Sequence, residues 1–169
     1  MTKTARDLQF PREFSPSEWP EGVLKHMAQE PLKALFSLRK KTGKPAYPSP
    51  LKRGHIREES STSSHSLKDF TRLSTATDFF VHREDALLWW AVIMEDIDVD
   101  GFGIYRWSRF KNSLDDFTMF HIDTPREGIE HKTVWVADRL RGESEFTYYS
   151  LNQSPQQYFE TLSKSGFFK

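Results

Sequence analysis

The chain has 169 residues, a length that suits one domain large enough to bury a hydrophobic core. Its 24 basic and 24 acidic residues balance, so the composition lacks the electrostatic footprint of a protein that binds nucleic acid or anionic lipid. Cysteine is absent, which excludes disulfides and thiolate metal sites and leaves histidine and carboxylate side chains as ligands for any zinc ion.

The N-terminal sequence and the apolar runs both argue against membrane insertion. The first residues, MTKTARDLQFPREF, lack the apolar region of a secretory signal. The longest apolar run, residues 86–94, is too short to span a bilayer. We therefore expect synthesis in the cytoplasm without a signal peptide. To act on a substrate outside the cell, the protein would need another route of delivery.

Helical patterns dominate the first quarter of the chain. Residues 1–16 are polar with early prolines and predict an N-terminal arm, which leaves residues 17–169 as a single domain. A broken helical stretch is expected over residues 18–41, because Pro31 restarts a helix and Gly43 is a natural stop. A cluster of cations at its end is interpreted as stabilising the helix C-terminus. The cluster consists of Arg39, Lys40, Lys41 and Lys44.

Two passages without clear periodicity follow this helix. Residues 45–51 contain three prolines and suit an irregular or edge-strand passage. Residues 58–66 are rich in glutamate, serine and threonine and have the composition of a flexible loop.

Short β-prone runs separated by turn residues make up most of the remaining chain. They cover residues 75–81, 102–105, 119–124 and 133–137. After the first of them, apolar residues at helical spacing predict a helix over residues 83–96. The residues expected on its buried side are Ala86, Leu87, Trp90, Ile93 and Met94.

The chain ends with a last predicted helix. Ser154 and Pro155 form its start, and Tyr158, Phe159 and Leu162 have the spacing of core residues. The order of elements is thus helices, then short strands with an inserted helix, then a helix. This order predicts an α+β domain around a small, mainly antiparallel sheet.

Two histidines and two aspartates stand where they can serve chemistry. His65 follows a serine-rich segment, and His121 lies within an apolar strand two positions before Asp123. Residues i and i+2 of a strand project from the same face, so His121 and Asp123 can address one point. Asp78 lies in another apolar strand, where an unpaired carboxylate would cost several kcal/mol and therefore needs a metal, an arginine or dense hydrogen bonding.

Two neutral imidazoles and one carboxylate are a known ligand set of catalytic zinc, with the fourth position left for water. Such an ion lowers the pKa of its water and polarises a carbonyl group. The other histidines are interpreted as surface or packing residues, and the last of them is the best placed to approach the site. They are His26, His55, His82 and His131.

Several short motifs occur in a characteristic order along the chain. Residues 14–19 read Phe-Ser-Pro-Ser-Glu-Trp, and residues 32–45 combine a helical pattern with a Thr-Gly-Lys-Pro turn. Residues 54–57 read Gly-His-Ile-Arg, residues 63–65 Ser-Ser-His, and residues 76–78 Ala-Thr-Asp.

The motifs of the second half complete the series. Residues 101–105 read Gly-Phe-Gly-Ile-Tyr, residues 120–124 Phe-His-Ile-Asp-Thr, and residues 133–135 Thr-Val-Trp. Taken together and in this order, the motifs resemble those of the D-alanyl-D-alanine carboxypeptidase family of zinc peptidases, in its single-domain branch. The resemblance covers most of the chain and implies the fold that these peptidases share with Hedgehog domains.

The resemblance also implies a function and a set of site residues. His65, Asp78 and His121 would bind Zn²⁺, Arg57 would pair with a substrate carboxylate or with the oxyanion of the intermediate, and Asp123 is a candidate for the general base. Members of the family cut peptide bonds in the stem or cross-bridge of peptidoglycan. Without a signal peptide, such a protein suits a bacteriophage, as a lysis enzyme or a virion component.

The chain departs from the family pattern at three points. Asp78 follows His65 by thirteen positions, which is a longer interval than in the family, and one extra residue precedes Arg57. Thr118 stands where several branches of the family have an acid three residues before the last histidine. Asp123 and Asp116 are the substitutes for this acid, and for Asp123 an orienting role beside the histidine is equally open.

These departures keep a second interpretation open. A phage particle could reuse the fold as a non-catalytic structural protein, with neighbouring virion proteins as its partners. In the first interpretation the partner is a peptidoglycan peptide. Neither interpretation involves nucleic acid.

Overall fold

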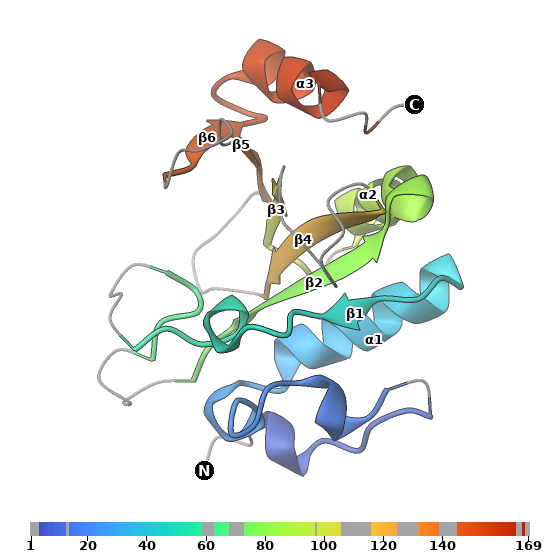
Figure 1. Cartoon of the computed structure of the whole chain (residues 1–169), viewed down its shortest axis with the longest axis vertical. Helices are drawn as coiled ribbons and strands as arrows, with labels where there is room; N and C mark the ends of the chain where they lie inside the picture. The colour runs from blue at the N-terminus through green and yellow to red at the C-terminus, as the bar shows by residue number, and fades with distance from the viewer. Residues whose placement is uncertain are drawn as a thin grey trace.

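A computed structural model describes residues 4–12, 14–58, 63–67, 73–96, 98–105, 116–124, 132–138, 145–164 and 167. In this part of the chain, six strands form one open, mostly antiparallel sheet that is accompanied by three α-helices (Figure 1). The α+β fold class predicted from the sequence is confirmed.

The strands lie side by side in the order β1-β2-β4-β3-β5-β6. Their bounds are Tyr47–Pro48 (β1), Ala76–His82 (β2), Gly101–Tyr105 (β3), Phe117–Asp123 (β4), Thr133–Asp138 (β5) and Thr147–Ser150 (β6). Neighbours are antiparallel, except that β3 and β5 are parallel. The proline-rich passage therefore supplies an edge strand, as predicted, whereas β6 at the other edge was not predicted.

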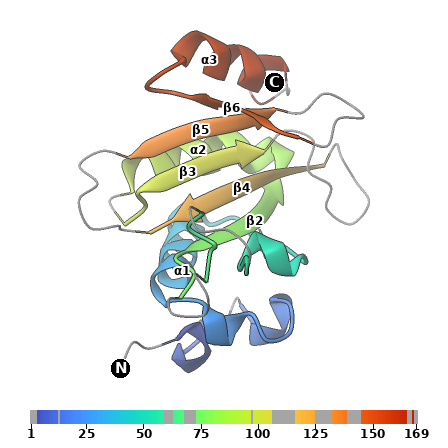
Figure 2. The same cartoon turned by 90° about the vertical axis from the view of Figure 1, so that its left-hand side faces the viewer.

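The helices are arranged asymmetrically around the sheet. Their bounds are Glu30–Thr42 (α1), Ala86–Glu95 (α2) and Pro155–Lys164 (α3). Helices α1 and α2 contact each other and cover one face of the sheet, which we call the helix face, while α3 packs beside β5 and β6. Figure 2 shows the sheet from its opposite face, with α1 and α2 behind the strands.

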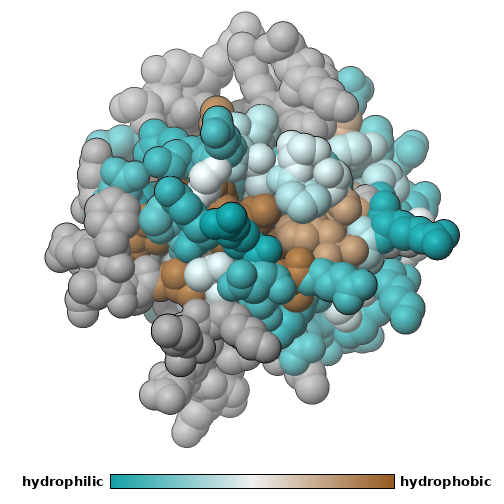
Figure 3. All heavy atoms as spheres, turned by 90° about the horizontal axis from the view of Figure 1, so that it is seen from below, coloured by the Kyte–Doolittle hydropathy of each residue, from teal (hydrophilic) through white to brown (hydrophobic). Residues whose placement is uncertain are grey.

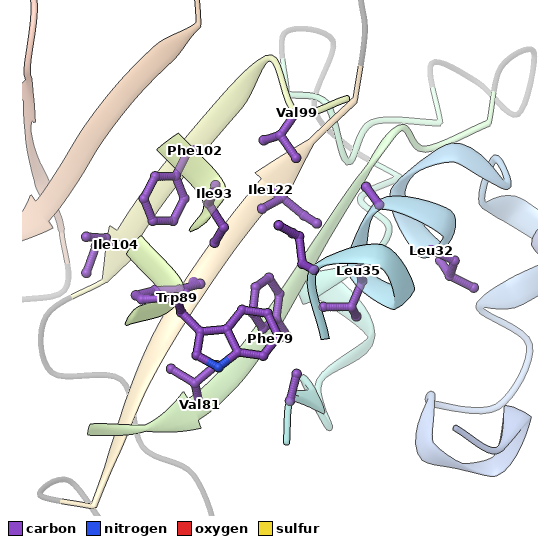
Figure 4. Packing of buried hydrophobic residues seen from close by; sticks show 14 of the residues in the cluster. Leu32, Leu35, Phe79, Val81, Trp89, Ile93, Val99, Phe102, Ile104 and Ile122 are labelled. Atoms are coloured by element: carbon purple, nitrogen blue, oxygen red, sulfur yellow. The ribbon is translucent and has the colours of Figure 1, made fainter. Parts of the chain in front are cut away.

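Apolar residues alternate along the central strands and point to the helix face, where they form the core. The Phe120 ring lies 5.8 Å from Phe79 on β2 and 5.2 Å from Phe102 on β3, both in edge-to-face contact. Trp89 of α2 lies 5.4 Å from Phe79 and is fully buried (Figure 4). These large rings give the core much of its buried apolar area.

Helix α1 ends as its sequence predicted. Gly43 adopts the left-handed conformation at φ 65°, and its N–H donates to the Arg39 carbonyl at 2.9 Å. Two lysines of the cationic cluster then reach the two ends of α2: Lys41 pairs with Asp96 and Lys44 with Asp85, each at 2.7 Å. Part of the cationic cluster thus joins two helices.

The first sixteen residues, predicted to form an arm, pack on the rest of the chain where the structure describes them. Ala5 and Phe14 are buried in the main core cluster, and the Phe14 ring lies 4.7 Å from Phe36 of α1. Seen from below, this end of the molecule presents apolar surface among hydrophilic residues (Figure 3). A hollow of about 390 Å³ is lined by Leu8, Gln9, Phe10, Pro11, Lys33 and Phe36.

The buried side of α2 differs from the predicted one. Ala86, Trp89 and Ile93 are buried, whereas Leu87 is 46 % exposed. Apolar residues surround this helix, so periodicity alone could not define which side is buried. In α3, Phe159 was likewise predicted to be in the core and is 44 % exposed, while Tyr158 and Leu162 are buried as predicted.

None of the helices in the described part of the chain combines the length and the apolar character that crossing a membrane requires.

Candidate metal centre

The register of the sheet places Asp78 beside His121. Asp78 of β2 is the direct partner of His121 of β4, and Gly103 of β3 is the partner of His121 on its other side. Because side chains alternate along a strand, Asp78 and His121 project from the face opposite to their neighbours Phe79 and Phe120. We call this second face of the sheet the site face.

His65 reaches the site face from the segment that precedes β2. Backbone hydrogen bonds hold this segment on both sides: Arg57 N–H donates to the His65 carbonyl at 2.8 Å, and Thr75 N–H donates to the Ser64 carbonyl at 3.0 Å. His65 is 1 % exposed. The predicted flexible loop over residues 58–66 therefore ends in a fixed position, while residues 59–62 lie outside the described part of the chain.

The three predicted ligands converge on one point. His121 Nδ1 lies 2.9 Å from Asp78 Oδ1 and 3.0 Å from His65 Nε2, and His65 Nε2 lies 3.3 Å from Asp78 Oδ1. A tetrahedron whose ligands lie about 2.1 Å from zinc has edges of about 3.4 Å. The three atoms thus approach the spacing of one tetrahedral face, and this buried group can hold a metal ion.

The chemistry of the three atoms also fits a cation. With a single N–H among them, that proton can bridge two of the atoms, but the remaining contact then brings two lone pairs together, which is repulsive. A single cation would satisfy all three at once. The other ring nitrogen of His65, Nδ1, is buried without a hydrogen-bond partner among the described residues.

Charges at the centre are strongly coupled. Burial disfavours the His121 cation, but hydrogen bonds to Asp123 and Asp78 outweigh burial and raise the pKa of His121 to about 9. Burial likewise opposes the Asp78 carboxylate, but the charges and hydrogen bonds of His65 and His121 hold the pKa of Asp78 well below its usual range. The arrangement therefore favours a carboxylate together with a cation, which can be a proton or a metal ion.

Asp123 lies behind His121 rather than among the three converging atoms. Its Oδ2 lies 3.3 Å from His121 Nε2 and accepts a hydrogen bond from Ser64 Oγ at 3.1 Å. A carboxylate on Nε2 leaves Nδ1 to face Asp78 and His65, which is the usual way to orient a metal-binding imidazole. A side chain on Gly101 would collide with this carboxylate, since its Cβ would lie 2.3 Å from Asp123 Oδ2.

Arg57 lies at the margin of the site. Its backbone pairs with the His65 segment, and its Nε donates to the Arg53 carbonyl at 3.4 Å. The guanidinium is near enough to the site face to act on Tyr105: burial and the Asp78 charge raise the pKa of Tyr105, and Arg57 opposes this shift. Arg57 therefore lies outside the cluster of converging atoms, and its charge acts on Tyr105 of the same face.

The two acids predicted as candidates for the general base lie at different distances from His121. Asp116 is exposed and precedes β4, roughly 16 Å along the strand from His121 at the usual rise per residue. Asp123 is buried and bonded to His121 and Ser64. Thr118 alternates with His121 and belongs to the helix face.

His55 has a larger role than the surface or packing role predicted for it. It is fully buried, and its two ring nitrogens lie 2.9 Å from Thr77 Oγ1 and 2.8 Å from the Ser49 carbonyl. Burial lowers the pKa of His55 to about 4. Since Ser49 N–H donates to the Asp78 carbonyl at 2.9 Å, His55 fixes the chain passage that lies against the Asp78 backbone.

The other histidines do not join the metal centre where the structure describes them. His82 is partly exposed and packs between Tyr47 and Phe117, and His26 lies near Lys25. His131 lies outside the described residues.

Comparisons of the chain with protein-family models, with curated proteins and with solved structures gave no match in any of the three.

Proposed function

We propose that the protein is a zinc-dependent peptidase that cuts peptide bonds in the stem or cross-bridge of peptidoglycan, as a phage lysis enzyme or a wall-degrading virion component. The observation that carries the proposal is the convergence of His65 Nε2, Asp78 Oδ1 and His121 Nδ1. The motif order resembles the D-alanyl-D-alanine carboxypeptidase family, and the α+β fold with its buried triad agrees with that family's general plan.

The donor set favours zinc over calcium and magnesium. Two imidazole nitrogens and one carboxylate oxygen suit Zn²⁺, whereas calcium and magnesium prefer sites built from oxygen atoms alone. A zinc ion held by His65, Asp78 and His121 would polarise the scissile carbonyl and lower the pKa of a bound water toward neutrality.

The protein's own residues would complete the site. Asp123 would hold the His121 proton on Nε2, so that the Nδ1 lone pair could bind metal. Arg57 would pair with a substrate carboxylate or with the developing oxyanion, for which a guanidinium fork is well suited. Its place beside the His65 segment supports this role.

Metal analysis of the purified protein tests the first half of the proposal. We expect about one zinc ion per chain, lost in His121→Ala and in the isosteric Asp78→Asn, and kept in the matched control His82→Ala, which removes a histidine from outside the triad. Circular dichroism establishes that the variants are folded. A folded His121→Ala protein that keeps stoichiometric zinc would contradict the site.

Hydrolysis tests the second half. Purified peptidoglycan should release new amino groups in the presence of the protein, and a chelator should abolish this release until zinc is restored.

A structural virion protein is the second candidate, and one observation favours it. Among the described acids, Asp123 is bonded to His121 and Ser64, and Asp116 is remote, so neither is placed as an obvious base. Protein that contains zinc yet releases no amino groups from peptidoglycan would support this candidate over the enzyme.

A further inference from the structure

Beside the metal centre, the site face carries an indole ring that lies directly on the sheet backbone. A Cβ on Gly103 would lie 2.1 Å from the six-membered ring of Trp135, so only glycine leaves room for the indole at this position of β3. The Trp135 ring lies 5.4 Å from the His121 ring. The glycine of β3 thus allows an aromatic side chain of β5 to reach the edge of the metal centre.

Trp135 belongs to a group of four rings that we call the aromatic cluster: Tyr105, Trp135, Phe146 and Tyr148. Trp135 lies 5.1 Å from Tyr105 of β3 and 5.4 Å from Tyr148 of β6, and Tyr105 lies 5.2 Å from Phe146. The cluster therefore runs across three neighbouring strands. At about 4.8 Å between strands, it extends from the metal centre by more than the length of one amino-acid side chain.

The outer end of the cluster, at Tyr148, is open to solvent. Tyr148 is 57 % exposed on the edge strand β6. In the described strands β5 and β6, the residues that share the site face with Trp135 and Tyr148 are neutral. An anionic ligand would find no cation on these strands, and the aromatic surfaces that bind nucleic acids combine stacking with positive charge.

We propose that the aromatic cluster is a saccharide subsite, which stacks neutral pyranose rings beside the metal centre. A pyranose ring has apolar C–H faces and a rim of hydroxyl groups, and the cluster offers the exposed phenol ring of Tyr148 beside the partly exposed indole of Trp135. The inference deepens the proposed function, because it assumes that these sugars belong to the substrate whose peptide bond lies at the metal.

Calorimetric titration of the full chain with the tetrasaccharide of N-acetylglucosamine tests the subsite. This probe is neutral and contains no peptide, so its binding requires neither hydrolysis nor zinc. We expect saturable binding that Tyr148→Ala weakens about tenfold, the effect of one lost aromatic contact of roughly 1.4 kcal/mol. Tyr148→Phe keeps the ring and should bind nearly as well as the wild type. Leu87→Ala, which removes a similarly exposed apolar side chain from α2, should leave binding unchanged.

Three results would overturn the subsite. The first is no saturable binding of the tetrasaccharide at millimolar concentration, and the second is equal binding by Tyr148→Ala and the wild type. The third is binding of a neutral tetra-alanine peptide that depends on Tyr148, with no binding of the tetrasaccharide, which would assign the cluster to peptide. If the purified protein contained no zinc, the proposed peptidase function would be contradicted. The tetrasaccharide titration would still test the subsite, because the probe binds without zinc.

Discussion

The two faces of the same sheet are built on opposite principles. Along β2 and β4, every second residue enters the helix face, where Phe79 and Phe120 contact each other and are fully buried in the core. The residues between them enter the site face, where Asp78 and His121 are almost as deeply buried but are polar. Burial of apolar groups stabilises the fold, whereas burial of a carboxylate costs several kcal/mol unless it is paired.

The glycines show the same contrast on the next strand. On β3 the helix face receives Phe102 and Ile104, while the site face has Gly101 and Gly103 in the same strand. A side chain at either glycine would collide with Asp123 or Trp135. On the helix face, β3 thus fills the space with its own side chains. On the site face, its glycines leave room for functional side chains of the neighbouring strands.

The largest effect is expected from a large cavity on the helix face. Phe79→Ala should lower the free energy of unfolding by about 3–5 kcal/mol, because it removes a fully buried ring that contacts Phe120 and Trp89. Urea unfolding measures the change. If the two faces are independent, the loss should be the same with and without zinc, and a zinc-dependent loss would show that the core supports the metal centre.

The next effect is the pH dependence of stability that comes from His55, the residue that holds the segment against the Asp78 backbone. Because the pKa of His55 is about 4 in the fold and about 6.5 in the unfolded chain, the unfolded chain binds more protons between these values. This group should therefore destabilise the protein as pH falls from about 6.5 to about 4, by about 3 kcal/mol in total. Below that range its contribution should level off.

The measurement is the pH dependence of the unfolding free energy in the wild type and in His55→Gln, and the difference between the two profiles isolates His55. A difference that does not change over this range would contradict the buried neutral ring. An NMR titration of the His55 ring with a midpoint near the ordinary value would do the same.

The elements predicted well from sequence are those in which local signals agree. Gly43 after a cationic helix end, and the alternation around Phe120 and His121, define α1 and β4 without knowledge of the fold. Strand β6 was missed because it has only four residues, Thr147–Ser150, and the first two are exposed. So short a run shows little periodicity. The buried side of α2 was predicted wrongly because the helix sequence is apolar on all sides.

The metal centre could be predicted from sequence because its chemistry is unusual for a strand, as the carboxylate of Asp78 shows. The supporting residues are harder to predict. His55 lacks any local signal, since its partners Thr77 and Ser49 are brought to it only by the fold. Trp135 is similar: its contact with Gly103 exists because β3 and β5 are parallel neighbours, which the sequence did not reveal.

A moderate effect is expected where the site face is kept free of side chains. Gly103→Ala should cost about 1–3 kcal/mol of unfolding free energy, because the new methyl group displaces the Trp135 ring. Near-ultraviolet circular dichroism should report the movement of the indole. If Trp135→Phe relieves the collision, the double variant should lose less than the sum of the single variants, and strict additivity would contradict the contact.

The smallest effect concerns the carboxylate behind His121. Asp123→Asn keeps an acceptor for His121 Nε2–H but removes the negative charge that strengthens this hydrogen bond, so zinc affinity should fall about tenfold, or about 1.4 kcal/mol. Competition with a chromogenic chelator measures the affinity. Asp138→Asn makes the same change of charge on the helix-face side of β5 and should leave the affinity unaltered. Equal losses in the two variants would mean that net charge, rather than orientation of the imidazole, governs the affinity of the site.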